Sequence, residues 1–470
     1  MKRNFIYLGL LTFGVGFWTI GAGFVPASNS SDPNPFPLQD LSLFNNPGKS
    51  WKIAGDVSSD LLKENTLFTS AGAGILFNQP SKKESGKDLF TNAEFGDIDL
   101  ELDYMIAKNG NSGIYLQGRY EVQLADSWET AQINSATNGG VYDLISPRVN
   151  ASKAPGLWQN LKISFQAPKF DGNGNKVENA RLLKVILNGV LVQENVELFK
   201  PTPGAIDEKE VEKAPLRIQG DHGAIAFRNI QISNRENTAA IKNEGNGTDP
   251  ILVDAPVNTI LRSFIDLDNQ VRVVHAVSVG SPQNVHYTYD LDYGMLVQAW
   301  RGKFLDATPM WDGRGNGTSI PQGAVQRFGK PSLSIAKLSN MESSWPVDTA
   351  NTQFRPKGYQ LDENDIPTFK YLIYGASVSD STSIMENGRG LNRSIKIADQ
   401  NSGDQSGIYY RLAKAKQIQE TSKGNYIIGD KEYYIQLNNP KNHKAIIRTV
   451  GEEKELIMPI SKEIQYSILF

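Results

Sequence analysis

Residues 111–126 combine aromatic, amide, carboxylate and guanidinium side chains within two short segments of β-type sequence. Side chains alternate across a strand, so Ile114 and Leu116 fall on one face and Tyr115 and Gln117 on the other. Aromatic rings can stack on flat, partly apolar molecules, and amides and carboxylates can bind hydroxyl groups. This pattern favours a sugar-binding surface, with an ordinary solvated sheet face as the alternative.

The second segment follows a break at Gly118 and repeats the alternation. Val122 and Leu124 take its apolar face, which leaves Glu121 and Gln123 on its polar face. The candidate ligand-contacting residues of the two segments and the break between them are Tyr115, Gln117, Arg119, Tyr120, Glu121 and Gln123.

A further set of candidates lies about 100 residues along the chain. The stretch 216–219 alternates apolar and polar residues, so Arg217 and Gln219 share one face. His222 follows directly after Asp221. An imidazole titrates near neutral pH and can act as a general base. The alternative is an ordinary exposed histidine.

Metal and cofactor signals in the sequence are weak. Residues 171–175 resemble the opening of a calcium loop, but Lys176 and Leu182 stand where an EF-hand requires glycine and glutamate. We therefore expect a hairpin tip there. A divalent metal held by His222 and Glu121 remains an open alternative, since one histidine with scattered acids is a weak metal pattern. No cofactor is predicted.

Composition narrows the function classes further. The chain has 470 residues, which is enough for two or more domains, and a net charge of −3. The basic residues are not clustered, which argues against nucleic acid as a partner. The chain has no cysteine, which excludes disulfides, thiolate zinc sites and a lipoprotein anchor.

The amino terminus has the pattern of an export signal. A basic start is followed by an apolar run from Phe5 to Phe24 and by small residues up to Ala27. We expect residues 1–27 to be a cleaved signal peptide, with an uncleaved anchor as the alternative. The mature protein is then periplasmic or extracellular and keeps no stable membrane span.

The rest of the sequence predicts an all-β protein. Residues 98–106 alternate apolar and acidic residues, and Asn-Gly pairs at 109–110 and 188–189 mark tight hairpins. Glycine- and asparagine-rich sequence at 235–257 indicates a linker. We therefore expect an extended leader at 28–42, a first β-domain at 43–234 and a second β-rich domain, a β-sandwich, at 258–470.

Several motifs resemble those of one known family. They occur in this order: Asn111–Ile114, Tyr120–Leu124, Trp158–Asn160, Leu187–Gly189, Gly204, Ile218–Gln219, His222–Gly223 and Phe227–Ile230. With these motifs, residues 43–233 resemble the 3-keto-disaccharide hydrolase family, over about two-fifths of the chain. The chain departs from the family pattern at Gln159, which separates the usual Trp-Asn pair, and in a long loop around residues 169–179.

The resemblance implies a concanavalin-like jelly roll, two antiparallel sheets packed face to face, and cleavage of 3-keto-glycosides as hydrolase or lyase. A ketone at carbon 3 acidifies the hydrogen on carbon 2, so a base near neutral pH and a group that stabilises the enolate are needed. His222 is the candidate base, Asp221 its orienting group, and Glu121 the alternative acid or base.

The remaining candidates take binding roles in this interpretation. Arg119 or Arg228 would stabilise the enolate, Tyr115 or Tyr120 would stack on the sugar ring, and the amides of Gln117, Gln123 and Gln219 would complete the binding face. The second hypothesis is a non-catalytic carbohydrate-binding protein or scaffold with the same aromatic and amide face.

Overall fold

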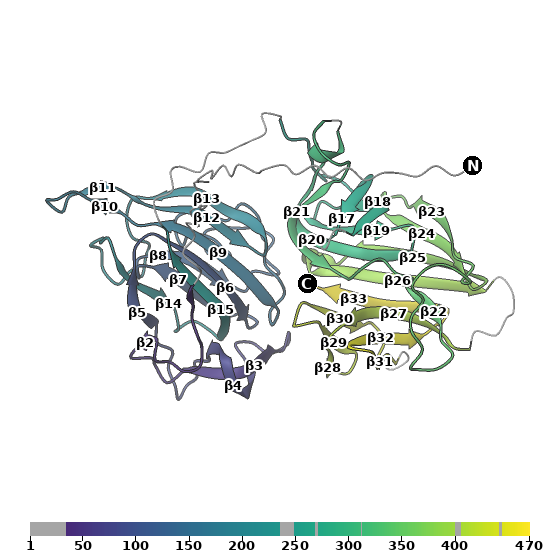
Figure 1. Ribbon diagram of the computed structural model, residues 1–470, viewed down its shortest axis with the longest axis horizontal. Coiled ribbons are helices and arrows are strands. Elements are labelled where there is room, and N and C mark those ends of the chain that lie inside the picture. Colours follow the sequence, from purple (N-terminus) through teal and green to yellow (C-terminus); the bar gives the residue numbers. More distant parts are fainter. Residues whose placement is uncertain (1–33, 236–248, 268–270, 312, 400–405, 441–443) are drawn as a thin grey trace, which may run out of the picture. The chain divides into compact units, whose positions relative to one another are not determined.

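The computed structural model describes residues 34–235, 249–267, 271–311, 313–399, 406–440 and 444–470 (Figure 1). The predicted signal peptide, the first residues of the leader and residues 236–248 of the predicted linker lie outside this range. The described residues form antiparallel sheets with two 3-10 turns, at Thr308–Met310 and Glu386–Gly388. The all-β prediction is confirmed. None of the helices in this part of the chain is long and apolar enough to cross a membrane.

Two sheets and a small hairpin make up the first β-region. The larger sheet has the order β13-β12-β9-β6-β15-β4-β3, with β1 paired to β15. Its strands are β1 (Asn34–Pro35), β3 (Trp51–Ser59), β4 (Leu67–Asn78), β6 (Ile98–Ile106), β9 (Trp158–Gln166), β12 (Ala180–Leu187), β13 (Val190–Leu198) and β15 (Ile225–Asn234). The smaller sheet, in the order β2-β5-β14-β7-β8, contains β2 (Phe44–Asn45), β5 (Leu89–Phe95), β7 (Asn111–Leu116), β8 (Tyr120–Ala125) and β14 (Ala214–Ile218). The hairpin is β10 (Lys169–Phe170) with β11 (Lys176–Glu178).

The two large sheets of this region share one hydrophobic core. Leu100 and Ile163 of the larger sheet and Ile114, Val122 and Ile218 of the smaller one belong to the same buried cluster. Leu100, Ile163, Val122 and Ile218 alternate with polar neighbours along their strands, so one face of each sheet is apolar and packs against the other sheet. This is the face-to-face sandwich that the sequence predicts.

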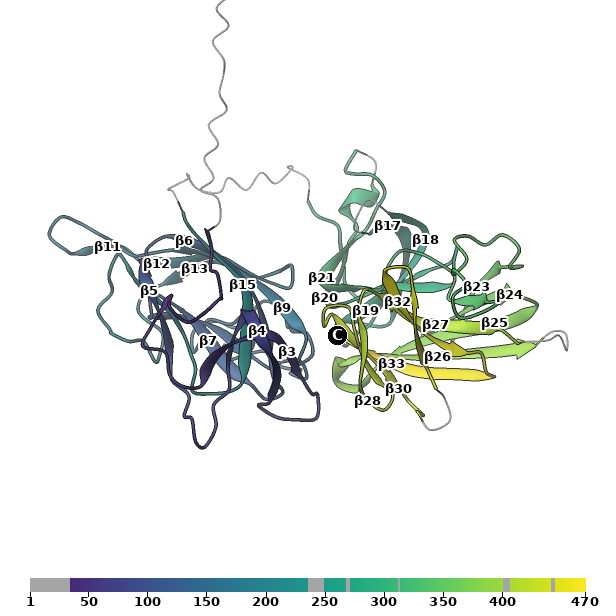
Figure 2. The ribbon, with the colours of Figure 1, turned by 60° about the horizontal axis from the view of Figure 1, so that its bottom comes forward.

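Three further sheets form the second β-region (Figures 1 and 2). One contains β16 (Leu252–Val253), β17 (Thr259–Asp266), β18 (Arg272–Gly280), β19 (Val285–Asp290), β20 (Met295–Asp306) and β21 (Ile320–Arg327). The second contains β22 (Ile335–Lys337), β27 (Ile408–Ala415), β31 (Ile446–Val450) and β32 (Glu453–Pro459). The third contains β23 (Arg355–Leu361), β24 (Pro367–Ile373), β25 (Ala376–Ile384), β26 (Gly390–Asp399), β28 (Ile418–Ser422), β29 (Asn425–Ile428), β30 (Tyr433–Leu437) and β33 (Glu463–Leu469).

A second hydrophobic core lies among these three sheets. Tyr289 of β19, Val378 of β25, Ile395 of β26, Tyr410 of β27 and Ile468 of β33 are all buried in one cluster. The rings of Tyr289 and Phe369 stack with their centroids 3.8 Å apart. Because all three sheets contribute to this cluster, the second β-region encloses its own packed interior.

Candidate active site

Antiparallel pairing aligns three polar side chains on neighbouring strands of the smaller sheet. Glu121 of β8 lies opposite Tyr115 of β7, and Tyr115 lies opposite Arg217 of β14. Side chains directly opposite each other in a sheet are close enough to interact. We call Glu121, Tyr115 and Arg217 the polar row. It brings together residues that are almost 100 positions apart in the sequence.

Arg217 is held firmly within the polar row. The carbon of its guanidinium lies 3.5 Å from the centroid of the Tyr115 ring, and its Nη1 donates a hydrogen bond of 2.7 Å to the carbonyl of Gly204. Its Nε lies 3.4 Å from a carboxylate oxygen of Asp88. The side chain is only 6% exposed, so the positive charge sits in a place with little water and acts strongly on its neighbours.

Glu121 has the electrostatic properties of an acid–base group. Burial raises the pKa of its carboxyl group to about 7, although Tyr115 and the positive charges of Arg217 and His222 act in the opposite direction. A β-carbon at Gly113 would lie 2.2 Å from a Glu121 carboxyl oxygen. The carboxyl group therefore lies across Gly113, and it exchanges a proton near neutral pH.

Tyr115 completes the row as a hydrogen-bond donor. Burial and the neighbouring Glu121 carboxylate raise the pKa of the phenol well above its usual value. The phenol therefore keeps its proton at neutral pH and presents an O–H group beside a carboxylate and a guanidinium. A donor and a fixed cation side by side can stabilise a developing oxyanion.

His222 and Asp221 lie at the exposed end of the site. Nδ1 of His222 contacts a carboxylate oxygen of Asp221, and the two side chains are 54% and 52% exposed. Both residues follow the end of β14, so the alternation of a strand does not separate them. They follow the strand that carries Arg217, and the electrostatic effect of His222 lowers the pKa of Glu121.

Two predicted amides flank the polar row. Nε2 of Gln123 donates hydrogen bonds to Asn111 Oδ1 at 2.6 Å and to the Ser112 carbonyl at 3.1 Å. The backbone N–H of Gln219 donates to the Gly113 carbonyl at 2.9 Å. Oε1 of Gln219 is buried and accepts no hydrogen bond from the described residues. An orphaned buried acceptor is uncommon in proteins and is available to a ligand hydroxyl group.

The segment between β13 and β14, residues 199–213, covers the polar row. We call it the covering loop. Thr202 Oγ1 accepts a hydrogen bond from the Glu121 backbone N–H at 3.0 Å, and the Tyr115 hydroxyl lies 3.4 Å from the Pro203 carbonyl. Gly204 has a φ of +79°, and a β-carbon there would lie 2.9 Å from the Tyr115 hydroxyl. The covering loop therefore needs glycine at this position to approach the row.

Gln117 and Arg119 hold the covering loop rather than face the polar row. Nε2 of Gln117 donates to the carbonyls of Phe95 and Glu212. Nε of Arg119 donates to the Lys209 carbonyl at 2.8 Å. Both side chains are buried, so they tie the β7–β8 turn to the covering loop.

Tyr120 and Arg228 are not brought together with the polar row. The Tyr120 ring belongs to the hydrophobic core, 5.6 Å from the Phe165 ring, and its hydroxyl donates to Glu210 at 2.6 Å. Arg228 lies on β15 in the other sheet, with its guanidinium 4.1 Å from the Trp158 ring centroid. Neither residue has a role in the proposal below.

Three residues of the site, Arg217, Asp88 and Gly113, receive no role in the sequence-based prediction. Alternation places Arg217 on the face shared with Gln219, but nothing in the sequence pairs it with Tyr115. Asp88 has no sequence signal beyond its position before a short strand, and Gly113 has no side chain that could mark it as functional. Only the register of β7, β8 and β14 reveals their roles. Within the described residues, no group of three or more His, Asp or Glu side chains could hold a metal ion.

Comparison with known proteins finds similarity over the first β-region. No curated protein matches the sequence. A candidate glycosyl hydrolase from Parabacteroides distasonis is 25% identical, with 47% of this chain and 100% of that chain covered and a TM-score of 0.32. A second from the same organism is 20% identical, with 43% and 100% covered and a TM-score of 0.30. The model of the 3-keto-alpha-glucoside-1,2-lyase-like domain matches residues 40–233, which confirms the predicted resemblance of this part of the chain to that family.

Proposed function

We propose that residues 40–233 cleave 3-keto-glycosides by removing the proton on carbon 2. The observation that carries the proposal is the buried Glu121 carboxyl group, whose pKa is raised to about 7 beside the Arg217 guanidinium. A base with a pKa near the working pH is best suited to proton transfer. The family match supports a substrate that carries a ketone at carbon 3 of a glucoside.

The reaction proceeds by elimination. The base takes the proton from carbon 2, and the electrons of that C–H bond form an enolate with the carbon 3 carbonyl. The enolate then expels the oxygen substituent on carbon 1, which leaves a double bond between carbons 1 and 2. The departing oxygen takes up a proton. Later addition of water across the double bond gives the free 3-keto sugar, so the overall result is hydrolysis.

The polar row supplies the groups for this reaction. Glu121 is the base, and the Arg217 cation with the Tyr115 hydroxyl stabilises the enolate oxygen. His222, held by Asp221, supplies the proton to the departing oxygen. The sequence favours His222 as the base; the proposal gives that role to Glu121 because its burial and raised pKa suit a base.

Exposure indicates how a substrate enters. Glu121 and Tyr115 are each only 2% exposed, whereas His222 and Asp221 are more than half exposed. A sugar therefore meets His222 and Asp221 first. It reaches Glu121 only when the covering loop moves aside, and the hydroxyl groups of the sugar then bind Gln123 and Gln219.

Export is part of this proposal. Residues 1–27 have the sequence pattern of a signal peptide, and they support action in the periplasm or outside the cell. Cell fractionation and amino-terminal sequencing of the mature protein test this directly. A mature protein that retains Met1 and stays in the cytoplasm would contradict it.

The experiment for the reaction uses a 3-keto-glucoside in heavy water. Elimination followed by addition of water places deuterium at carbon 2 of the product, which mass spectrometry detects. Glu121→Gln should abolish cleavage, whereas Glu94→Gln, which changes an exposed acid on the same sheet, should not. Cleavage without deuterium at carbon 2 would contradict the elimination. Binding without any cleavage by the natural chain would leave a carbohydrate-binding protein.

A further inference from the structure

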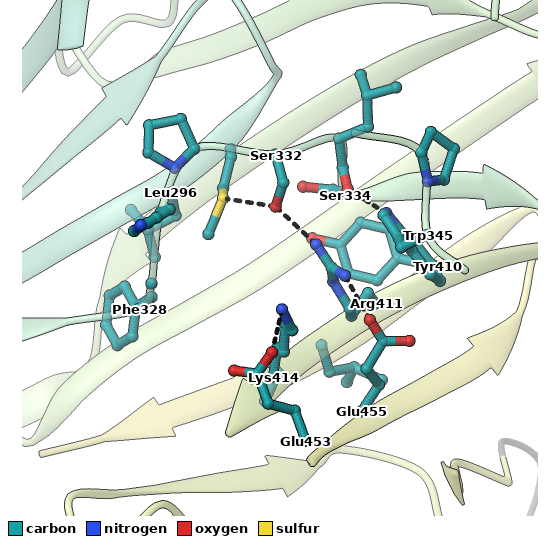
Figure 3. A pocket seen from close by; sticks show the side chains of 18 of the residues that line it. Leu296, Phe328, Ser332, Ser334, Trp345, Tyr410, Arg411, Lys414, Glu453 and Glu455 are labelled. Atoms are coloured by element: carbon teal, nitrogen blue, oxygen red, sulfur yellow. Dashed lines mark hydrogen bonds and ion pairs between the residues drawn. The ribbon is translucent and has the colours of Figure 1, made fainter. Parts of the chain in front are cut away.

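The second β-region contains a large cavity that the proposed reaction does not use. Its volume is about 670 Å³, within the range of small-molecule sites. It is lined by residues of β20, β27, β32 and β33 and by the segments 328–334 and 344–347 (Figure 3). The family match ends at residue 233, so it assigns nothing to this cavity.

A β-bulge directs two cations of one strand into the cavity. In β27 the pairing with β32 shifts between Arg411 and Ala413. Side chains three residues apart in a regular strand point to opposite faces of the sheet. A bulge between them adds one residue, so the two side chains then point to the same face. Arg411 and Lys414 consequently both line the cavity, and Figure 3 shows both side chains directed toward its centre.

The cations around the cavity outnumber the carboxylates. Arg411 Nη1 and Arg448 Nε bind the two oxygens of one carboxylate, Glu455, at 2.6 and 2.8 Å. These three side chains are at most 9% exposed. Lys414 pairs separately with Glu453 at 2.5 Å. Two buried guanidinium groups, of which only that of Arg411 lines the cavity, share one carboxylate, so Glu455 does not fully compensate the charge of Arg411, and this arrangement favours an incoming anion.

Most of the remaining lining residues are apolar or aromatic. Phe328 lies on the wall across from Arg411 in Figure 3, and its ring packs edge-on against Tyr433 with centroids 5.2 Å apart. The Trp345 ring lies 4.4 Å from the Arg411 guanidinium carbon and holds it in place. Ser332 Oγ accepts a hydrogen bond from Arg411 Nη2 at 2.6 Å. The cavity thus offers a fixed cation at one wall and an apolar surface at the other.

We propose that this cavity binds a small organic carboxylate. The carboxylate lies near Arg411 and Lys414, and the body of the ligand lies against Phe328. The cavity of about 670 Å³ has room for a ligand at least as large as a monosaccharide or a small aromatic acid. Two sources share this chemistry: an acidic sugar and an acid with an apolar body. The proposal does not depend on the reaction assigned to Glu121.

Isothermal titration of the whole protein at low salt tests this proposal with three probes. D-Glucuronate and benzoate represent the two sources, and D-glucose is the neutral control. We expect at least one carboxylate to bind at least tenfold more tightly than glucose, and the tighter of the two identifies the source. Equal binding of glucose and glucuronate, with no binding of benzoate, would overturn the proposal. So would the absence of binding by both carboxylates.

Two variants with opposite charge effects locate the binding. Lys414→Gln should weaken carboxylate binding about tenfold, as loss of a charge-assisted contact does, whereas Glu453→Gln should strengthen it. Both side chains are 44% exposed, so neither change disturbs the core. Lys416→Gln, an exposed position outside the cavity lining, is the matched control. Equal effects of Lys414→Gln and Glu453→Gln, or loss of carboxylate binding in Glu121→Gln, would place the ligand elsewhere and overturn the proposal.

Discussion

At the scale of single residues, the reaction proposed for the first β-region depends on one buried carboxyl group, that of Glu121. Glu121 lies in a setting that penalises its charged form, so burial outweighs the lowering effect of Arg217 and His222 on its pKa. Gly113 makes the position possible because it leaves space for the carboxyl group. Neighbouring strands thus provide the proposed base, Glu121 on β8, and the space for its carboxyl group, beside Gly113 on β7.

The pH dependence of catalysis should follow the titration of Glu121. The base form accumulates as pH rises through about 7, so kcat/KM of the natural protein should rise with pH through an inflection near that value. Glu121→Gln should lower kcat/KM by about 10²- to 10⁴-fold and remove this inflection. Rates with a 3-keto-glucoside between pH 5 and 9 provide the measurement. A variant that retains the inflection would show that another group is the base.

The same carboxyl group should make the folded protein less stable as pH rises, whereas it should make catalysis faster. Its pKa is about 7 in the folded chain against a usual value of 4.5, so the folded state holds the proton more tightly. This contribution is present below pH 4.5 and is lost as pH rises through 7. The free energy of unfolding of Glu121→Gln, relative to that of the natural protein, should therefore rise by roughly 3 kcal/mol between pH 4 and pH 9. Urea unfolding of both proteins across this range measures the difference, and a constant difference would contradict the raised pKa.

Gly113→Ala tests the space beside Glu121. The new β-carbon would lie 2.2 Å from the carboxyl oxygen, so the carboxyl group must move and cleavage should fall at least tenfold. Gly172→Ala is the control, since a β-carbon there meets no atom within 4 Å. Steady-state rates and circular dichroism separate a local displacement from unfolding. Full activity in Gly113→Ala would mean that the position of the carboxyl group is not critical.

At the scale of elements, strand register creates contacts that no single strand contains. In the smaller sheet, the pairing of β7 with β8 and β14 builds the polar row. In the second β-region, a bulge in β27 turns Arg411 and Lys414 toward one cavity. Bulges are often found beside functional sites because they redirect side chains.

Strands β25 and β26 provide a test of a buried ion pair. Nη2 of Arg393 donates to both oxygens of Asp380 at 2.6 and 2.7 Å, and neither side chain is more than 1% exposed. Asp380→Asn would leave the guanidinium without its counter-charge and should cost about 3–5 kcal/mol of stability. Urea unfolding measures this cost. The double variant Asp380→Leu with Arg393→Met should recover most of it, and a single variant within 1 kcal/mol of the natural protein would contradict the prediction.

At the scale of the whole molecule, the two proposed sites should act independently. They belong to different sheets and different hydrophobic cores, and changes at separate sites without shared partners usually add. The double variant Glu121→Gln with Lys414→Gln should therefore show the sum of the two single effects, on cleavage and on carboxylate binding respectively. Both assays on all three variants test this. A change in cleavage caused by Lys414→Gln alone would reveal coupling between the sites.

Much of the first β-region follows from the sequence alone. Alternation along residues 111–125 places Glu121 and Gln123 on the face opposite Ile114 and Val122, and the structure confirms that Ile114 and Val122 are in the core. The prediction instead made Tyr120 a ligand-contacting residue, but the structure places its ring in the core with Val122. A period of two is a local property, so the sequence predicts which face a side chain takes.

Tertiary structure alone decides which faces meet. Arg217 reaches Tyr115 because β14 pairs with β7, and Arg228 lies apart because β15 belongs to the other sheet. The raised pKa of Glu121 comes from burial, which outweighs the lowering effect of Arg217 on a strand far away in the sequence, and the C-terminal cavity depends on the bulge in β27. Register and burial arise from contacts between segments far apart along the chain, which no local pattern contains.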